Sequence, residues 1–248
     1  MRIATFNVNS VRAHLANIME WLESAHVDVV LMQEIKCETH AFPAQTFEDA
    51  GYNVAVYGQK SYNGVAILSR LSIEDVNRGI PGYDDASARY IDAVIDGYFR
   101  IVNVYIPNGN PIGTEKFRYT LDWRKQLEAR LRELLKYDEP LIIGGDMNVV
   151  VDEGMIYDPK ALLDDAVRSP EVIASFARLS SEMPLNLVPN REYTYYDYRA
   201  GMFAKGKGVV LDYFLVNDKV EVSSHYVDKT PRLSPGASDH VPLILETI

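Results

Sequence analysis

Cysteine and positive charge are both scarce in this chain of 248 residues. Cys37 is the only cysteine, so no internal disulfide can form, which fits a reducing compartment. Lysine and arginine number 25 against 35 aspartates and glutamates, which gives a formal net charge of −10. This balance argues against a broad cationic surface that wraps nucleic acid, although it leaves room for a narrow basic strip.

Long apolar runs, linkers and repeats are missing as well. No apolar run approaches the length of a membrane span, and Asn7 and Asn9 interrupt the first residues, "MRIATFNVNS", where a signal peptide would be continuously apolar. No Pro/Ser-rich linker or fixed-period repeat divides the chain. With 47% hydrophobic residues, the chain can bury one large core. We therefore expect one soluble domain over residues 1–248, cytoplasmic and monomeric, with no membrane contact and no obligate protein partner.

Short β-rich runs alternate with a few helical patterns. Strands are predicted at "RIATFNV", "VDVVLMQ", "NVAVY", "GVAIL", "YIDAVI", "FRIVNVYI", "PLIIGG", "VVLDYFLV" and "VPLILE". Amphipathic patterns predict helices over residues 10–24 and 116–136, and Ser169 followed by Pro170 predicts the start of a third over 169–181. Many strands with few helices favour packed sheets flanked by helices over a regular βαβ repeat.

Polar side chains follow many of these runs. In "PLIIGGDMNVVVDEG", Asp146 and Asn148 stand two apart and would point to the same side of an extended chain, while Gly144 and Gly145 would permit close approach to the backbone. Taken alone, such a pair is equally typical of turn-capping residues at a strand exit. The pattern recurs at other run ends, at Asn7, Asn9, Glu34, Tyr105, Asn108, Asp212, Asp239 and His240.

These residue types suit a hard divalent cation beside a phosphate. Carboxylate and amide oxygens with retained waters are what Mg²⁺ prefers, whereas a zinc site would need several histidine or cysteine ligands. An imidazole, a phenol and an amide would add donors for the charge that builds on phosphoryl oxygens. His240 stands next to Asp239, and this context favours a functional role for it. We predict structural roles for the remaining histidines, which lack such context: His14, His26, His40 and His225.

Eight segments in order carry a resemblance to a known family. They are "TFNVNSVRAH", "LMQEIK", "YGQKSYNGVAILS", "NVYIPNGNP", "GGDMNV", "YTYYDYR", "LDYFLV" and "SDHVP". Together they resemble the exonuclease III family of AP endonucleases, within the endonuclease/exonuclease/phosphatase superfamily, over nearly the whole chain. The resemblance implies a DNase I-like α/β fold: a four-layer α/β sandwich of two mixed sheets packed face to face, with helices on the outside.

The resemblance also implies a metal site at one end of the sandwich. Glu34 would be the principal ligand of Mg²⁺, with Mn²⁺ as a substitute. Asn7, Asn9 and Asp239 would lie near the metal.

The same resemblance implies the catalytic groups. Asp146 would orient or deprotonate the attacking water or assist the leaving group, and Asn148 and Tyr105 would hold the scissile phosphate. His240 would pair with Asp212. A carboxylate bonded to one ring nitrogen fixes the tautomer of an imidazole and favours its protonated form, which leaves the other nitrogen to donate to a phosphoryl oxygen.

A basic segment, "YRAGMFAKGKG", is the candidate strip for nucleic acid. It contains three cations, no acidic residue and several glycines, although an ordinary solvated loop would have the same composition. With the resemblance, it leads us to expect DNA contacts at Arg12, Lys36, Lys60, Asn108, Tyr195, Arg199, Lys205 and Lys207.

The chain also departs from the family pattern. Ser10 replaces the usual glycine, and "SEMPLNLVPNRE" lacks the usual Gly-Leu-x-Asp-x-Phe-Arg pattern. Tyr195 replaces the usual Trp or Phe, and Val210 stands where relatives usually carry arginine. We expect Tyr195 and Val210 to lie where the family shapes its abasic-sugar pocket and grips DNA.

The sequence thus predicts a Mg²⁺-dependent phosphodiesterase for duplex DNA that cuts 5′ to abasic sites and trims 3′ ends during base excision repair. Tyr105 in "VYIPNGN" favours the DNA repair branch, because other branches of the superfamily tend to place histidine in this motif. Two alternatives stay open: a same-fold phosphatase or phosphodiesterase for a smaller phosphoester, and a catalytically silent module that binds DNA ends.

Overall fold

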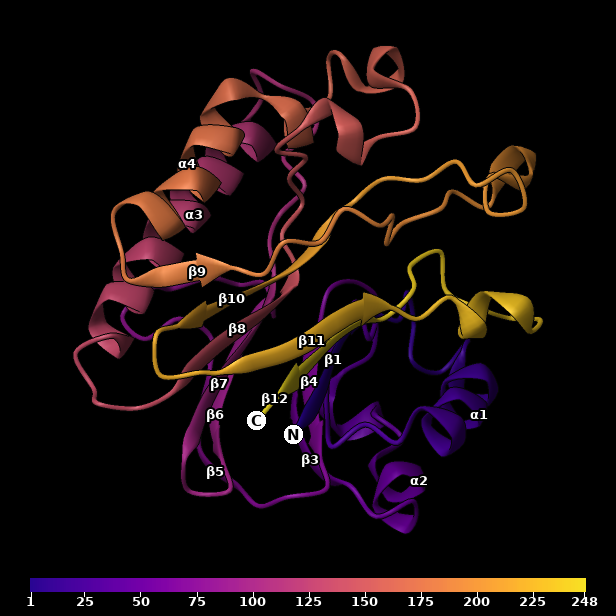
Figure 1. Cartoon of the computed structure of the whole chain (residues 1–248), viewed down its shortest axis with the longest axis vertical. Helices are drawn as coiled ribbons and strands as arrows, with labels where there is room; N and C mark the ends of the chain where they lie inside the picture. The colour runs from indigo at the N-terminus through magenta and orange to yellow at the C-terminus, as the bar shows by residue number, and fades with distance from the viewer.

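Twelve strands form two six-stranded mixed sheets in the computed structural model, which describes residues 1–248 (Figure 1). Sheet A has the order β11 (Val222–Val227), β12 (Leu243–Thr247), β1 (Arg2–Asn7), β2 (Val29–Gln33), β4 (Val65–Ser69) and β3 (Asn53–Tyr57). Sheet B has the order β5 (Ile73–Arg78), β6 (Tyr90–Ile95), β7 (Phe99–Tyr105), β8 (Leu141–Asp146), β10 (Asp212–Asn217) and β9 (Leu185–Leu187).

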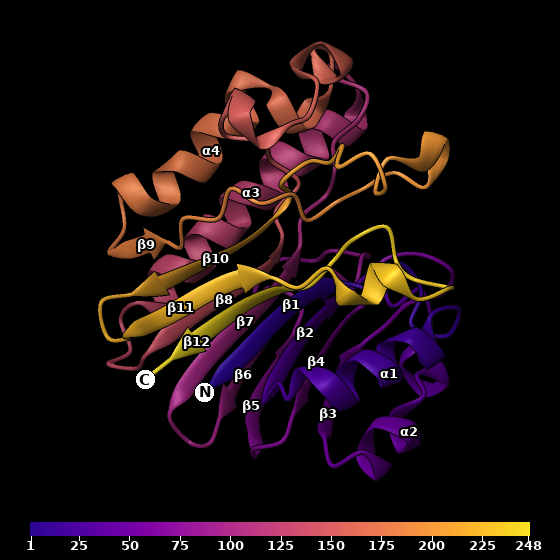
Figure 2. The ribbon, with the colours of Figure 1, turned by 45° about the vertical axis from the view of Figure 1, so that its right-hand side comes forward.

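Four α-helices cover the outer faces of the sheets. They are α1 (Leu15–Ala25), α2 (Ala44–Asp49), α3 (Glu115–Leu134) and α4 (Pro170–Ser181). In Figures 1 and 2, α1 and α2 lie outside sheet A, and α3 and α4 lie outside sheet B. Six short 3₁₀ helices lie in the loops: η1 (Thr39–Ala41), η2 (Glu153–Met155), η3 (Pro159–Leu162), η4 (Ala166–Arg168), η5 (Arg199–Gly201) and η6 (Thr230–Leu233). The predicted four-layer sandwich is confirmed.

Three apolar clusters fill the spaces between these four layers. One packs α3 and α4 against sheet B, and another packs α1 and α2 against sheet A. The third lies between the sheets, where Leu31 of β2 and Phe214 of β10 belong to the same cluster. Because both faces of the central strands are covered, β2 and β8 are buried along their whole length, which explains their continuous apolar runs.

A few buried polar side chains also join the two sheets. Gln33 of sheet A donates from Nε2 to Oδ1 of Asn103 in sheet B at 2.8 Å and to Oγ1 of Thr5 at 2.9 Å. Asn103 in turn donates to the backbone carbonyls of Met32 and Ala66 in sheet A at 2.9 and 2.8 Å. These hydrogen bonds satisfy groups that would otherwise be buried without partners.

Strand direction brings the polar strand ends to one edge. β1 and β2 are parallel, as are β7 and β8, so the carboxyl ends of each pair lie together. β10 runs antiparallel to β8, with Asp212 opposite Asp146, and β12 runs antiparallel to β1. The ends of four strands and the beginnings of two others therefore meet at the same end of the sandwich.

All nine predicted strands are present, but the first predicted helix begins late. α1 starts at Leu15, and it cannot include the predicted first residue, Ser10, because the φ of Ser10 is 95°. The two glycines near the end of β8 also differ from their expected use. A Cβ on Gly145 would lie 2.0 Å from the carbonyl oxygen of Val104, and one on Gly144 would lie 2.5 Å from the Phe214 ring. These glycines admit neighbouring parts of the protein.

The expectation that Val210 lies where the family grips DNA is wrong. Its side chain is completely buried in the cluster between sheet B and the outer helices. Its N–H donates to the carbonyl of Met155 at 2.9 Å. Its neighbours Val209 and Leu211 line the cleft described below. Adjacent residues of an extended segment point to opposite sides, so Val210 points into the core.

Val210→Arg should therefore destabilise the protein rather than tighten its grip on DNA. The new guanidinium would be buried with no acidic partner, at a cost of about 3 kcal/mol or more, which corresponds to a fall in Tm of roughly 6–12 °C for a chain of this size. Thermal unfolding by circular dichroism measures the effect. Ser223→Arg, at an exposed position of the edge strand β11, is the matched control for the added charge and should change Tm little. Equal Tm values for Val210→Arg and the wild type would contradict the burial.

Candidate active site

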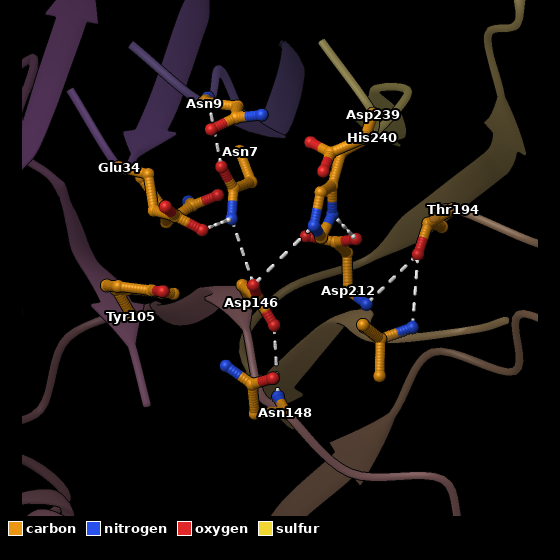
Figure 3. A network of polar contacts seen from close by, with 12 residues as sticks. Asn7, Asn9, Glu34, Tyr105, Asp146, Asn148, Thr194, Asp212, Asp239 and His240 are labelled. Atoms are coloured by element: carbon orange, nitrogen blue, oxygen red, sulfur yellow. Dashed lines mark hydrogen bonds and ion pairs between the residues drawn. The ribbon is translucent and has the colours of Figure 1, made fainter. Parts of the chain in front are cut away.

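The predicted site residues gather around a cleft of about 520 Å³ at this end of the sandwich (Figure 3). Residues of the segment 157–167 and the basic segment form its outer walls. The predicted residues that line it are Glu34, Tyr105, Asn108, Asp146, Asn148, Tyr195, Arg199, Lys207, Asp239 and His240.

Asn7 links the two sheets at the floor of this site. Its Nδ2 donates to Oε1 of Glu34 at 2.9 Å and to Oδ2 of Asp146 at 3.0 Å (Figure 3). Its Oδ1 accepts from the backbone N–H of Asn9 at 3.1 Å. Since Glu34 follows sheet A and Asp146 ends a strand of sheet B, one buried amide holds carboxylates from both sheets together.

His240 is held between two aspartates. Its Nδ1 lies 2.8 Å from Oδ2 of Asp212, and its Nε2 lies 3.8 Å from Oδ2 of Asp146 (Figure 3). Thr194 fixes the start of β10, because its Oγ1 accepts from the backbone N–H groups of Leu211 and Asp212 at 3.1 and 3.2 Å. The imidazole therefore has a fixed orientation, with Nε2 directed towards the other catalytic candidates.

Left-handed backbone conformations concentrate at the strand exits. Glu34 and Lys36 after β2 have φ values of 50° and 52°, and Asn148 after β8 has 43°. Non-glycine residues adopt this region at a cost, and such residues cluster at functional sites. In this conformation the N–H of Asn148 donates to Oδ1 of Asp146 at 3.0 Å.

Burial and neighbouring charge set the protonation of the central groups. Burial, reinforced by the charge of Asp212, raises the pKa of Asp146 to about 7. Burial opposes the protonation of His240, but Asp212 and then Asp146 outweigh it and raise the pKa of His240 to about 10. His240 is therefore a cation at neutral pH.

The pKa values of Glu34 and Tyr105 shift in opposite directions. Burial tends to raise the pKa of Glu34, but the hydrogen bond from Asn7 and the charge of Lys36 outweigh it, and the pKa is lowered. Burial, with the charges of Glu34 and Asp146, raises the pKa of Tyr105 well above its ordinary value. Glu34 is thus an anion and Tyr105 a protonated donor.

The arrangement of oxygens suits a cation. The ammonium of Lys36 lies 2.9 Å from Oε2 of Glu34 and also donates to Oδ1 of Asn9, so these oxygens are placed to share one positive charge. Asp146, Asp212 and His240 form a second group whose ligand atoms lie within 4.8 Å of one another. In that group Asp212 is bonded to Nδ1 of His240. Hard oxygen donors dominate both groups, as Mg²⁺ or Mn²⁺ requires.

The predicted DNA contacts are only partly brought together. Those in the cleft wall are Asn108, Tyr195, Arg199 and Lys207. Tyr195 packs edge-on against His240 with ring centroids 5.1 Å apart. The guanidinium of Arg199 is bonded to Asp197, with Nη2 2.7 Å from Oδ2. The other four predicted contacts lie outside the cleft lining: Lys36, which is paired with Glu34, and Arg12, Lys60 and Lys205 on exposed loops.

Several supporting residues were not predicted. Arg89 stacks on the Tyr105 ring, 4.6 Å from its centroid, and donates to the Tyr105 carbonyl. Ser238 donates to the carbonyl of Asn7 at 2.7 Å and accepts from the N–H of His240 at 3.2 Å. Arg124 reaches the turn after β8 from helix α3. Ser238, within "SDHVP", lies next to the predicted Asp239 and so carried a direct sequence signal.

A model of the endonuclease/exonuclease/phosphatase family matches residues 4–240. The chain belongs to this family. Exodeoxyribonuclease III of Haemophilus influenzae is 31% identical over 267 aligned residues, with 99% of each chain covered. The match confirms the resemblance to the exonuclease III type of this family, a group of hydrolytic nucleases.

Solved structures of family members have the same architecture. An AP endonuclease from Archaeoglobus fulgidus matches with a TM-score of 0.93 and 32% identity, covering 100% of this chain and 99% of that one. A 3′ phosphatase from Neisseria, bound to a product DNA hairpin, matches with a TM-score of 0.94 and 31% identity over 100% of this chain and 99% of that one. None of the helices in the present chain is both long and apolar enough to cross a membrane.

Proposed function

We propose that the protein is a Mg²⁺-dependent phosphodiesterase that acts on duplex DNA, cutting 5′ to abasic sites and trimming 3′ ends to leave a 3′-hydroxyl. The observation that carries the proposal is the cationic His240, held by Asp212, facing Asp146 beside a cleft that also contains Glu34. Relatives named for DNA substrates, and a neighbour solved with a DNA hairpin, support DNA as the partner and the cytoplasm as the location.

Glu34 is the principal ligand for the cation in this proposal, with Asn7, Asn9 and Asp239 around it. Glu34 and Asp239 line the cleft and are within reach of an ion from solvent, whereas Asp212 is fully buried. Mg²⁺, or Mn²⁺ in its place, would neutralise the negative charge that builds on the phosphoryl oxygens.

Asp146 orients the attacking water or takes its proton. With a pKa of about 7, it exchanges a proton readily near neutral pH, as a general base must. His240, which stays protonated, donates from Nε2 to a phosphoryl oxygen. Tyr105 and Asn148 donate to the remaining oxygens and hold the scissile phosphate in line with the water.

The test must also distinguish two alternative functions. A 3′ phosphatase activity is favoured by the likeness to the Neisseria protein, which was solved with a product DNA hairpin. A purely DNA-binding role is disfavoured by the four acidic residues, Glu34, Asp146, Asp212 and Asp239, because a binder gains nothing from negative charge beside phosphate.

The test is a gel assay with three labelled duplexes, each incubated with Mg²⁺ or with EDTA. One contains a single abasic site, one has a recessed 3′-hydroxyl end, and one ends in a 3′-phosphate. Hydrolysis of p-nitrophenyl phosphate, a small phosphoester, is measured in parallel.

We expect incision 5′ to the abasic site and shortening of the recessed strand, both abolished by EDTA. Reaction of the 3′-phosphate duplex alone would restrict the function to a 3′ phosphatase. Activity on p-nitrophenyl phosphate alone, or DNA binding without cleavage, would refute the proposal.

A further inference from the structure

Arg124 is a buried cation that lies behind the active site. It stands in the middle of α3 and is 4% exposed. Its Nη2 donates to two successive backbone carbonyls, those of Met147 at 2.8 Å and Asn148 at 2.9 Å. Its Nε is buried without a hydrogen-bond partner. The guanidinium thus holds the turn that follows Asp146 from the side opposite the cleft.

The absence of an ionic partner makes this arginine unusual. Buried charges are normally paired, as Arg100 is with Asp92 at 2.9 Å. Arg124 forms no ion pair. Burial lowers the pKa of Arg124 to about 9 against the opposing charge of Asp146, and the guanidinium stays charged at neutral pH. Two neutral carbonyls compensate poorly for burying a cation. Stability alone therefore does not explain why a charged residue occupies this position.

The conformation of the turn that Arg124 holds can explain the buried charge. Asn148 has a φ of 43°, in the left-handed region that non-glycine residues adopt at a cost, although asparagine tolerates it better than most. This conformation directs its N–H to Asp146 at 3.0 Å and its Nδ2 to the carbonyl of Ile106 at 2.8 Å. A fixed cation bonded to the other side of the turn stabilises this conformation and offsets the excess negative charge of the cleft.

We propose that Arg124 is a positioning residue for the reaction: it holds the turn from Asp146 to Asn148 in its left-handed conformation and supplies a buried positive charge behind the acidic cleft. Its side chain is not among those that line the cleft. The inference rests on the proposed function, since the consequence is a slower chemical step with little change in DNA affinity.

Three variants separate the contributions. Arg124→Gln removes the charge and keeps a planar amide donor, while Arg124→Lys keeps the charge and loses the forked donor. Arg130→Gln is the matched control, because Arg130 lies on the same helix and pairs with Asp92 at 2.9 Å, away from the cleft. The measurements are Tm, kcat and KM on the recessed 3′-end duplex, and hydrogen exchange at the amide of Asn148.

For Arg124→Gln we expect a fall in kcat of about 10²-fold, as for a small misplacement of catalytic groups, with KM nearly unchanged and faster exchange at Asn148. Arg124→Lys should recover part of the lost kcat. Arg130→Gln should lower Tm while keeping kcat and the Asn148 exchange close to wild type.

Two results would overturn the inference: wild-type exchange at Asn148 in Arg124→Gln, or a kcat equal to that of Arg130→Gln. An inactive wild-type protein would instead refute the proposed function. The exchange measurement does not need activity, so it tests the role of Arg124 in either case.

Discussion

Glu34→Gln is expected to lose at least about 100-fold in kcat/KM at low Mg²⁺, since even residues next to metal ligands typically contribute 10–100-fold to metal affinity. The change removes one negative charge and no volume. Glutamine can still accept the hydrogen bond from Asn7, so the fold and the turn after β2 should be retained. Cleavage of the abasic duplex across a Mg²⁺ titration measures the loss, and calorimetry measures Mg²⁺ binding directly.

The matched control is Glu38→Gln, the same chemical change at an exposed residue four positions along. It should leave both the cleavage rate and Mg²⁺ binding unaltered. If Glu34→Gln cleaved at the wild-type rate at low Mg²⁺, Glu34 could not be the principal ligand. The compact group formed by Asp146, Asp212 and His240 would then be the better candidate.

Asp212→Asn and His240→Asn should each lower kcat by about 10³-fold or more, and the double variant should be little worse than the poorer single one. The reason is their direct 2.8 Å contact. Asp212 orients the ring of His240 and raises its pKa, so removing either residue removes the same oriented cation. Single-turnover rates for the four proteins of the double-mutant cycle give the coupling.

His225→Asn is the control for this cycle. His225 lies on the edge strand β11, and its ring is hydrogen-bonded to the carbonyl of Pro189 at 3.0 Å. Its substitution should leave kcat unchanged. Additive losses for Asp212→Asn and His240→Asn would show that the two residues act independently, whatever their distance. Circular dichroism of each variant establishes that the buried exchange has not unfolded the protein.

The strands that sequence patterns failed to predict share one property. β5, β9 and β11 were missed, and each lies at the edge of its sheet. The residues of β5, "IEDVNR", are mostly exposed or half-buried, and those of β11 are mostly polar. Edge strands pair on one side only and are often charged, which avoids association with other chains. The apolar runs that identified the interior strands are therefore absent from them.

Site residues that stand beside apolar runs could be predicted from the sequence. Supporting residues on the outer helices could not be predicted in this way. Glu34, Asp146 and His240, which the sequence singled out beside apolar runs, do lie together at one cleft. Arg124 follows no strand. It does occupy the apolar stripe of α3, at the spacing of Thr120, Leu127 and other buried residues of that helix. A charged residue on such a stripe is the signal that could have identified it.

Val210 illustrates the opposite error. Comparison with the family pattern placed it on the DNA side, while the alternation of the extended segment directs it into the core. A position in a motif does not determine which way a side chain points. The local geometry decides this, and a sequence pattern without a confirmed register cannot supply it.

The polar contacts between the sheets determine how far one half of the site can shift relative to the other. A slip of one residue would translate a strand by about 3.3 Å, enough to break the hydrogen bond of 3.0 Å between Asn7 and Asp146. Apolar side chains between two sheets resist such a translation weakly, because their attraction has little direction. The amides of Gln33 and Asn103 do have direction. The amides of Asn7, Gln33 and Asn103 therefore fix the offset between the two sheets, and with it the alignment of the two halves of the site.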